Sequence, residues 1–223
     1  MRYSLSDFSF SGYLEQDEVR AVINAVPLVS LHPERDMLFF ELMWQTGARV
    51  SEATTLVPEH IGMTSVVLQN LKQSKRVKDP VTGKPKRVSD TTATKEVEVS
   101  ESLCNHLKEF CDRHKIPKGE YVFKSNYKTG HMRRGYAWLI LTKASEMARV
   151  YKFGKKHSRT GGRFKGAYPH MLRHSSAMKL LEETHDIMIV KQQLGHSSVK
   201  TSQIYAYVKK PAIRRAIAQI NWE

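Results

Sequence analysis

Four kinds of side chain stand out in this sequence because together they could transfer a phosphoryl group: arginine, histidine, lysine and tyrosine. The arginines, histidines and tyrosine gather in three short stretches, TGARVSEA (46–53), HMLRH (170–174) and LGHSSVKTSQIY (194–205), and the lysine stands at a predicted strand end. Guanidinium groups offer paired hydrogen-bond donors to phosphate oxygens and stabilise the negative charge of the transition state. An attacking tyrosine must lose a proton and the leaving oxygen must gain one, which requires a general base and a general acid. The pattern therefore favours phosphoryl transfer that needs no metal ion.

Each stretch taken alone has an ordinary explanation. Arg49 could be a surface charge, and His170 and Arg173 could share one solvated helix face because they are three residues apart. Residues 186–205 resemble a helix-turn-helix with Gly195 at the turn, which alone would favour a DNA-binding module without catalysis. The combination of all three stretches in one basic protein favours the catalytic interpretation.

The charge of the chain indicates a polyanionic partner. Its 223 residues include 36 Lys and Arg against 22 Asp and Glu, a net charge of +14. Nucleic acid is the leading partner, and an anionic membrane surface is the second. No apolar run approaches the roughly 18–20 residues that span a bilayer, and residues 1–10 lack a signal-peptide core, so we expect a cytoplasmic protein.

We expect neither a metal nor a cofactor. Cys104 and Cys111 are the two cysteines, which is too few for a Cys-rich zinc site, and the ten histidines are scattered. The two cysteines share a predicted helix face with apolar residues, which is typical of buried reduced thiols.

The elements that must position these residues are mainly helical. Apolar residues at helical spacing predict eight helices, over residues 15–26, 33–47, 101–114, 133–150, 169–183, 186–194, 198–208 and 211–220. The helix over 33–47 is apolar nearly all round and should be central and buried.

Two β-rich runs predict the strands of a small antiparallel sheet, residues 64–71 and 94–99. Residues 72–93 and 152–166 read as basic loops rich in Lys, Gly or Pro, and the first should be long and mobile. The predicted fold class is thus mainly α with a small antiparallel β-sheet (α+β).

The three stretches resemble the signature of the tyrosine recombinases, the phage integrase family. The first box, TG-x-R-x-x-E, is matched by TGARVSE, with Glu52 as its acidic residue. The second, H-x-L-R-H, is matched by HMLRH, and the third places an IY pair nine residues after LGH, as LGHSSVKTSQIY does. The resemblance implies a catalytic domain of that fold with six catalytic residues: Arg49, Lys72, His170, Arg173, His196 and Tyr205. Tyr205 would be the nucleophile, and Tyr207 would point differently on the same helix.

The lysine rests on the position of a strand end. In the family it ends the second strand of the small sheet, and SVVLQNLK places Lys72 there. Lys75 is the next candidate, and Lys95, at the start of the following strand, is the third.

The resemblance covers residues from about 13 to 220. It predicts an N-terminal tail or linker over 1–14 and one catalytic domain over 15–223, which includes the helix over 211–220. Larger members carry a further N-terminal DNA-binding domain. This chain is expected to be either a fragment of such a protein, which its linker-like start favours, or similar to the short single-domain members that invert DNA segments.

The family implies a site-specific recombinase of double-stranded DNA. Strands would be cleaved and rejoined through a 3′-phosphotyrosine, in integration, excision, resolution or inversion. A homo-tetramer would form on paired DNA sites, with weak association or monomers in the absence of DNA. Two alternatives remain: a type IB topoisomerase-like relaxing enzyme, and a non-catalytic helix-turn-helix module.

Overall fold

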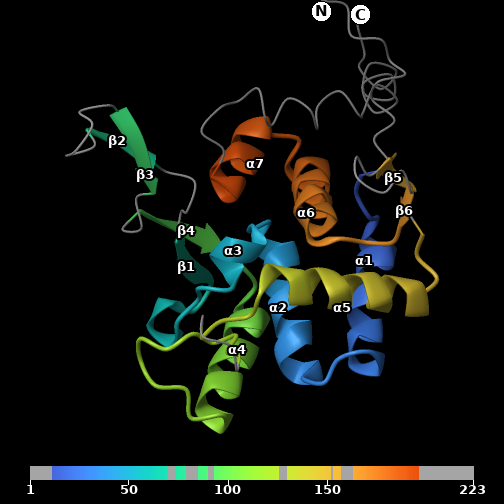
Figure 1. Ribbon diagram of the computed structural model, residues 1–223, viewed down its shortest axis with the longest axis horizontal. Helices are drawn as coiled ribbons and strands as arrows, with labels where there is room; N and C mark the ends of the chain where they lie inside the picture. The colour runs from blue at the N-terminus through green and yellow to red at the C-terminus, as the bar shows by residue number, and fades with distance from the viewer. Residues whose placement is uncertain are drawn as a thin grey trace, which may run out of the picture.

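A computed structural model provides the structure of the protein. It describes residues 12–69, 93–125, 130–151 and 166–195, and the backbone alone of 74–78, 85–89, 153–156 and 163–165. Helices account for most of this part, as Figure 1 shows.

The centre of the molecule is helix α2, Pro33–Thr46. Its apolar side chains Phe39, Phe40, Leu42 and Met43 are fully buried. The helix contacts α1 (Gln16–Ala25), α4 (Glu101–Arg113) and α6 (Pro169–Thr184). The sequence prediction of a central buried helix is therefore confirmed.

Three further helices complete the surroundings of the site. Helix α5, Arg134–Met147, runs against α1 and contacts the short helix α3, Val50–Ala53 (Figure 1). Helix α7, Ile187–Leu194, packs on α6 through Val190 and Leu194. Two 3₁₀ turns, Val26–Leu28 (η2) and Pro58–His60 (η3), connect helices and strands.

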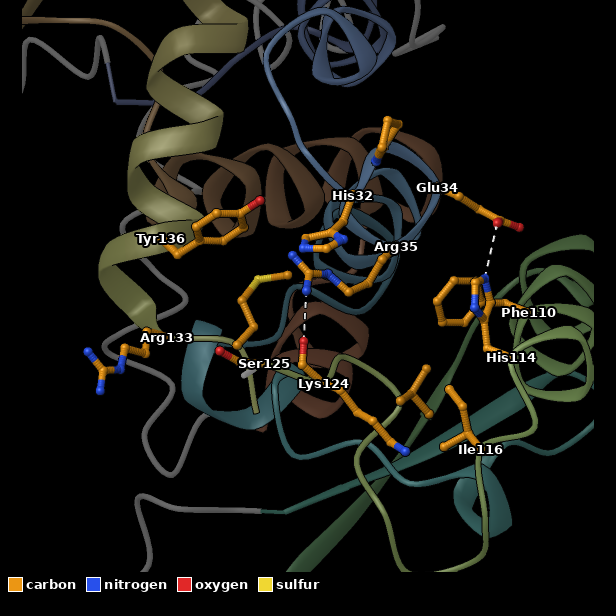
Figure 2. A pocket seen from close by; sticks show the side chains of 13 residues that line it. His32, Glu34, Arg35, Phe110, His114, Ile116, Lys124, Ser125, Arg133 and Tyr136 are labelled. Carbon is orange, nitrogen blue, oxygen red and sulfur yellow. Dashed lines mark hydrogen bonds and ion pairs between the residues drawn. The ribbon is translucent and has the colours of Figure 1, made fainter. Parts of the chain in front are cut away.

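A buried carboxylate fixes α5 against the start of α2. Asp36 is fully buried and accepts hydrogen bonds from Ser30 Oγ at 2.5 Å and from the Tyr136 hydroxyl at 2.8 Å. Its neighbour Arg35 donates to the carbonyl of Lys124 at 2.7 Å and lies over the Tyr136 ring (Figure 2). Arg35, Lys124 and Tyr136 line a pocket of about 520 Å³ between α2, α4 and α5. The first turn of α5 is thereby held in place, and this turn carries Arg134.

Strands β1 (Ser65–Gln69) and β4 (Thr94–Glu98) form the predicted antiparallel pair. Val66, Leu68 and Val97 turn into the core. The register places Lys95 opposite Leu68. The strand pairing expected from the sequence is confirmed.

The interpretation of both basic segments as loops was wrong in part. Within residues 72–93, strands β2 (Ser74–Lys78) and β3 (Pro85–Ser89) form an antiparallel hairpin, which extends beyond the β1–β4 pair (Figure 1). Within 152–166, β5 (Phe153–Lys156) pairs with β6 (Arg163–Lys165). These strands are rich in Lys and Arg and lack apolar alternation, so periodicity could not reveal them. Backbone hydrogen bonds define the pairing.

The start of the chain contributes to the core. Leu14 is 1% exposed, and its N–H donates to Ser175 Oγ at 2.8 Å. The last residue of the predicted tail, 1–14, therefore packs on the domain. Residues 1–11 and the predicted helices over 198–208 and 211–220 lie outside the described residues.

Cys104 and Cys111 are both free and buried in α4, as predicted. No helix in the described part of the chain is long and apolar enough to cross a bilayer.

Candidate active site

Arg49 stands in the short connection between α2 and α3. Helix α2 ends at Thr46, and Gly47 follows in the left-handed region with φ of 59°. The connection turns the chain so that Arg49 becomes the N-terminal flanking residue of α3. The TGARVSE stretch is therefore a helix end, a tight turn and a new helix start.

Gly47 is required here for space as well as for its φ angle. A Cβ atom at this position would lie 2.1 Å from Leu194 Cδ2 and 3.2 Å from Ser176 Oγ. Leu194 is fully buried at the end of α7, so it has little room to move. The end of α2 and the end of α7 thus approach each other closely because residue 47 has no side chain.

Gly47→Ala should therefore destabilise the protein more than an alanine at an uncrowded glycine. Both the left-handed backbone, about 1–2 kcal/mol, and overpacking, about 1–3 kcal/mol, oppose the substitution. Gly119→Ala is the matched control, because Gly119 also has positive φ (79°) but would meet nothing within 4 Å. Urea unfolding of the two variants measures the difference, and equal losses of unfolding free energy would contradict the close approach.

Glu52 is a fully buried carboxylate that gathers cations around it. Its Oε1 accepts from Arg49 Nη1 at 2.6 Å, and its Oε2 accepts from the Arg49 backbone N–H at 3.0 Å. Lys95 Nζ lies 3.1 Å from Oε2. Burial alone would raise the pKa of Glu52, but Lys95 and the two Arg49 donors outweigh it, so the pKa lies below its ordinary value. Glu52 is therefore an anion that orients Arg49 and Lys95.

Arg173 joins the ends of two helices. It lies on α6, is 5% exposed, and donates through Nη1 to the carbonyl of Gly47. Its Nη2 donates to the carbonyl of Leu194 at 2.9 Å. The planar guanidinium suits two acceptors at once. Arg173 thus ties the Gly47 turn, beside Arg49, to the end of α7.

His170 lies in the first turn of α6, at an exposed position on the rim of a cleft of about 500 Å³. The cleft is also lined by Arg49, Arg134, Trp138 and Tyr168. Desolvation by the cleft walls, followed by the charges of Arg173, Arg49 and Arg134, lowers the pKa of His170. A lowered pKa keeps the imidazole neutral near pH 7, so it can accept a proton.

The structure places Lys95, the third candidate for the active-site lysine, beside Glu52. The side chain of Lys95 is 11% exposed. Burial lowers the pKa of Lys95, Glu52 opposes that effect, and Arg173 and Arg49 add to it. Lys72 lies outside the described residues, and of Lys75 only the backbone in β2 is described. The assignment of Lys72 as the active-site lysine stays a prediction.

Leu194 and Gly195, the first two residues of the LGHSSVKTSQIY stretch, contact Arg173 and Lys95. Leu194 ends α7, and Gly195 follows with φ of 63°. His196, Tyr205 and the alternative Tyr207 lie outside the described residues. Of the six predicted catalytic residues, the structure thus places Arg49, His170 and Arg173 around one site, and the roles of all six remain proposals.

Three residues of this site were not identified from the sequence: Arg134, Trp138 and Tyr168. Arg134 and Trp138 are four residues apart at the start of α5, so they lie on one helix face. The two consecutive arginines at the start of that helix, Arg133 and Arg134, were an available signal. Tyr168 comes two residues before the HMLRH stretch, and the neighbouring sequence contains no motif that would identify it as a site residue.

Comparison with known proteins agrees with this geometry. The sequence model of the phage integrase family matches residues 12–211. Tyrosine recombinase XerD of Corynebacterium glutamicum is 31% identical over 207 residues, which is 90% of this chain and 58% of the relative. The chain therefore spans little more than half the length of this curated relative.

Two solved recombinases share the fold. The XerA recombinase superposes with a TM-score of 0.65 at 22% identity, covering 93% of this chain and 62% of that one. The XerH site-specific recombinase, bound to palindromic difH substrate in a post-cleavage complex, gives 0.64 at 20% identity and covers 93% and 52%. With the family model matched over most of the chain and its first two boxes gathered around one cleft, the chain belongs to the phage integrase family, the tyrosine recombinases.

Proposed function

We propose that this chain is the catalytic domain of a site-specific DNA recombinase that cleaves and rejoins strands through a 3′-phosphotyrosine. The observation that carries the proposal is the cation cluster around Glu52. Arg49 and Lys95 form ion pairs with this one buried carboxylate, and Arg173 donates to the backbone carbonyls of Gly47 and Leu194. Three cations against one carboxylate leave positive charge for an anionic ligand, and the cleft at His170 opens beside them.

In the first step, the Tyr205 hydroxyl attacks the phosphorus of the scissile phosphodiester. His170 accepts the phenolic proton, since its lowered pKa leaves the ring neutral. A new bond forms between phosphorus and the tyrosine oxygen, and the bond to the 5′-oxygen breaks. Lys72 donates a proton to that oxygen, which leaves as a 5′-hydroxyl.

Arg49, Arg173 and His196 bind the non-bridging oxygens during this step. Donors already fixed in position stabilise developing charge without reorganising, which is the main advantage of such a site. The contacts of Glu52 and the carbonyls of Gly47 and Leu194 hold the two guanidinium groups in place.

In the second step, the 5′-hydroxyl of a partner strand attacks the phosphotyrosine, restores a phosphodiester and releases Tyr205. The bond energy is conserved, so neither ATP nor a metal ion is needed. The partner is double-stranded DNA, consistent with a net charge of +14 and with the substrate complex of XerH. Exchange between two sites calls for a homo-tetramer on DNA, with weak association or monomers without it, in the cytoplasm.

The experiment that tests this function follows two labelled DNA sites in excess EDTA. The enzyme, as the full-length protein that contains this domain, should form a covalent DNA adduct and then join strands from different sites. Relaxation of supercoiled DNA without exchange between sites would indicate a topoisomerase-like enzyme. DNA binding with no adduct would indicate a non-catalytic module, and either result would refute the proposal.

Lys72→Ala should be rescued by a substrate with a 5′-bridging phosphorothiolate. The sulfur leaving group needs no proton, so a missing general acid no longer limits cleavage. Arg49→Ala should not be rescued, because phosphate charge must still be stabilised. Cleavage rates on the oxygen and sulfur substrates provide the measurement, and rescue of Lys75→Ala in place of Lys72→Ala would transfer the role to Lys75.

A further inference from the structure

Lys95 makes contacts on two sides that belong to different parts of the fold. It lies on β4 with its side chain nearly buried. Its Nζ reaches Glu52 Oε2 at 3.1 Å and approaches the carbonyl oxygen of Leu194 at 3.5 Å. One side chain thus connects the small sheet, α3 and the end of α7.

The stem of Lys95 also packs against the end of α7. A Cβ atom on Gly195 would lie 3.1 Å from Lys95 Cδ and 3.7 Å from Nζ. Gly195 therefore leaves the space that the lysine occupies. The absence of a side chain at Gly47 allows Leu194 to approach closely, so the end of α7 contacts Lys95 at Gly195 and the Gly47 turn at Leu194.

The end of α7 is held by cations. The carbonyl of Leu194 accepts from Arg173 Nη2 at 2.9 Å and has Lys95 Nζ as a second, longer neighbour. Carbonyl groups at a helix C-terminus carry partial negative charge, so cations stabilise them. The next residues of the chain are Gly195 and His196, the start of the segment that leads to Tyr205.

We propose that Lys95 is a positioning residue, which locks the end of α7 onto the Glu52 cluster and so sets where the 196–205 segment begins relative to Arg49 and Arg173. The inference rests on the proposed function, because it concerns the alignment of the nucleophile with the phosphate-binding arginines. Its role differs from that of a general acid. The ammonium group acts on Glu52 and on Leu194, and the effect reaches the phosphate through them.

The test compares three variants of the DNA-competent protein. Lys95→Met keeps the length of the stem and removes the charge. Lys95→Arg keeps the charge and the donors. Lys179→Met is the matched control, because Lys179 forms an exposed ion pair with Glu183 on α6, away from the cluster.

The measurements are DNA affinity and single-turnover cleavage at saturating DNA, on oxygen and 5′-phosphorothiolate substrates. Lys95→Met should bind DNA normally and cleave both substrates on the order of 10²-fold more slowly, since misplacement of about 1 Å has that effect. Lys95→Arg should recover most of the rate, and Lys179→Met should match the wild type throughout.

Three results would overturn the inference. Wild-type cleavage by Lys95→Met would show that the contact has no consequence. Full rescue of Lys95→Met by the phosphorothiolate would make Lys95 the general acid. Failure of Lys95→Arg to recover any rate would show that cationic donors at this position are not what matters. A wild-type protein that forms no adduct would instead refute the proposed function, so the two failures are distinguishable.

If Lys95→Met does not fold because Glu52 loses a partner, the comparison moves to a Glu52→Gln background, which removes the buried charge. The inference then predicts that Lys95→Met slows cleavage further in that background, through the lost contact with Leu194. Equal rates with and without Lys95→Met would contradict it.

Discussion

Tyr205→Phe should abolish covalent attachment to DNA and leave DNA binding unchanged. The substitution removes one oxygen atom, which is the proposed nucleophile, and keeps the aromatic ring. Loss of the attacking atom leaves no route to the phosphotyrosine, so the adduct should fall below detection. Adduct formation on a nicked suicide substrate and affinity by fluorescence anisotropy provide the two measurements.

Tyr207→Phe is the matched control, since Tyr207 lies two residues further along the same predicted helix. This variant should form the adduct at a rate close to that of the wild type. Normal adduct formation by Tyr205→Phe together with loss in Tyr207→Phe would reassign the nucleophile.

Arg49→Lys and Arg173→Lys should each slow cleavage by about 10²–10³-fold, although both keep the positive charge. A single ammonium cannot reproduce a planar pair of donors, and removal of one preorganised donor typically has an effect of this size. Arg173 serves two carbonyls at once, Gly47 and Leu194, which a lysine cannot both reach in the same geometry.

The two arginine variants should differ in stability. Arg173→Lys leaves a buried carbonyl without its donor, which should cost about 1–3 kcal/mol of unfolding free energy. Arg49 is partly exposed, and Arg49→Lys should unfold close to the wild type. Arg113→Lys, in an exposed ion pair with Glu34, is the control for both measurements. Cleavage by both active-site variants within a few-fold of the control would show that these arginines do not bind the phosphate.

The helices and the β1–β4 pair could be predicted from the sequence because their apolar residues recur with a clear period. Val19, Val22 and Ile23 mark α1 in this way, and Val66, Leu68 and Val97 mark the strands. The β2–β3 and β5–β6 hairpins carry basic residues in place of such a pattern. Their backbone pairing leaves no periodic trace in the sequence, so both segments read as loops.

The positions of Arg49, His170 and Arg173 followed from short local motifs, which set helix starts and helix faces. The place of Lys95 did not follow in the same way. The prediction ranked lysines by their distance from a strand end, whereas the position of Lys95 beside Glu52 depends on which face of β4 it occupies. Lys95 and Val97 are two residues apart, so both turn toward the interior. A lysine in phase with an apolar valine on the same predicted strand was the available signal.

The most direct test of the central claim identifies the amino acid that becomes attached to DNA. Wild-type protein is trapped on a suicide substrate in excess EDTA, digested with protease, and the peptide that carries the nucleotide is sequenced by mass spectrometry. We expect a single phosphotyrosine at Tyr205, linked to a 3′-phosphate, with a free 5′-hydroxyl on the released strand. An adduct on any other residue, a 5′-phosphate linkage, or cleavage that requires added magnesium would contradict it.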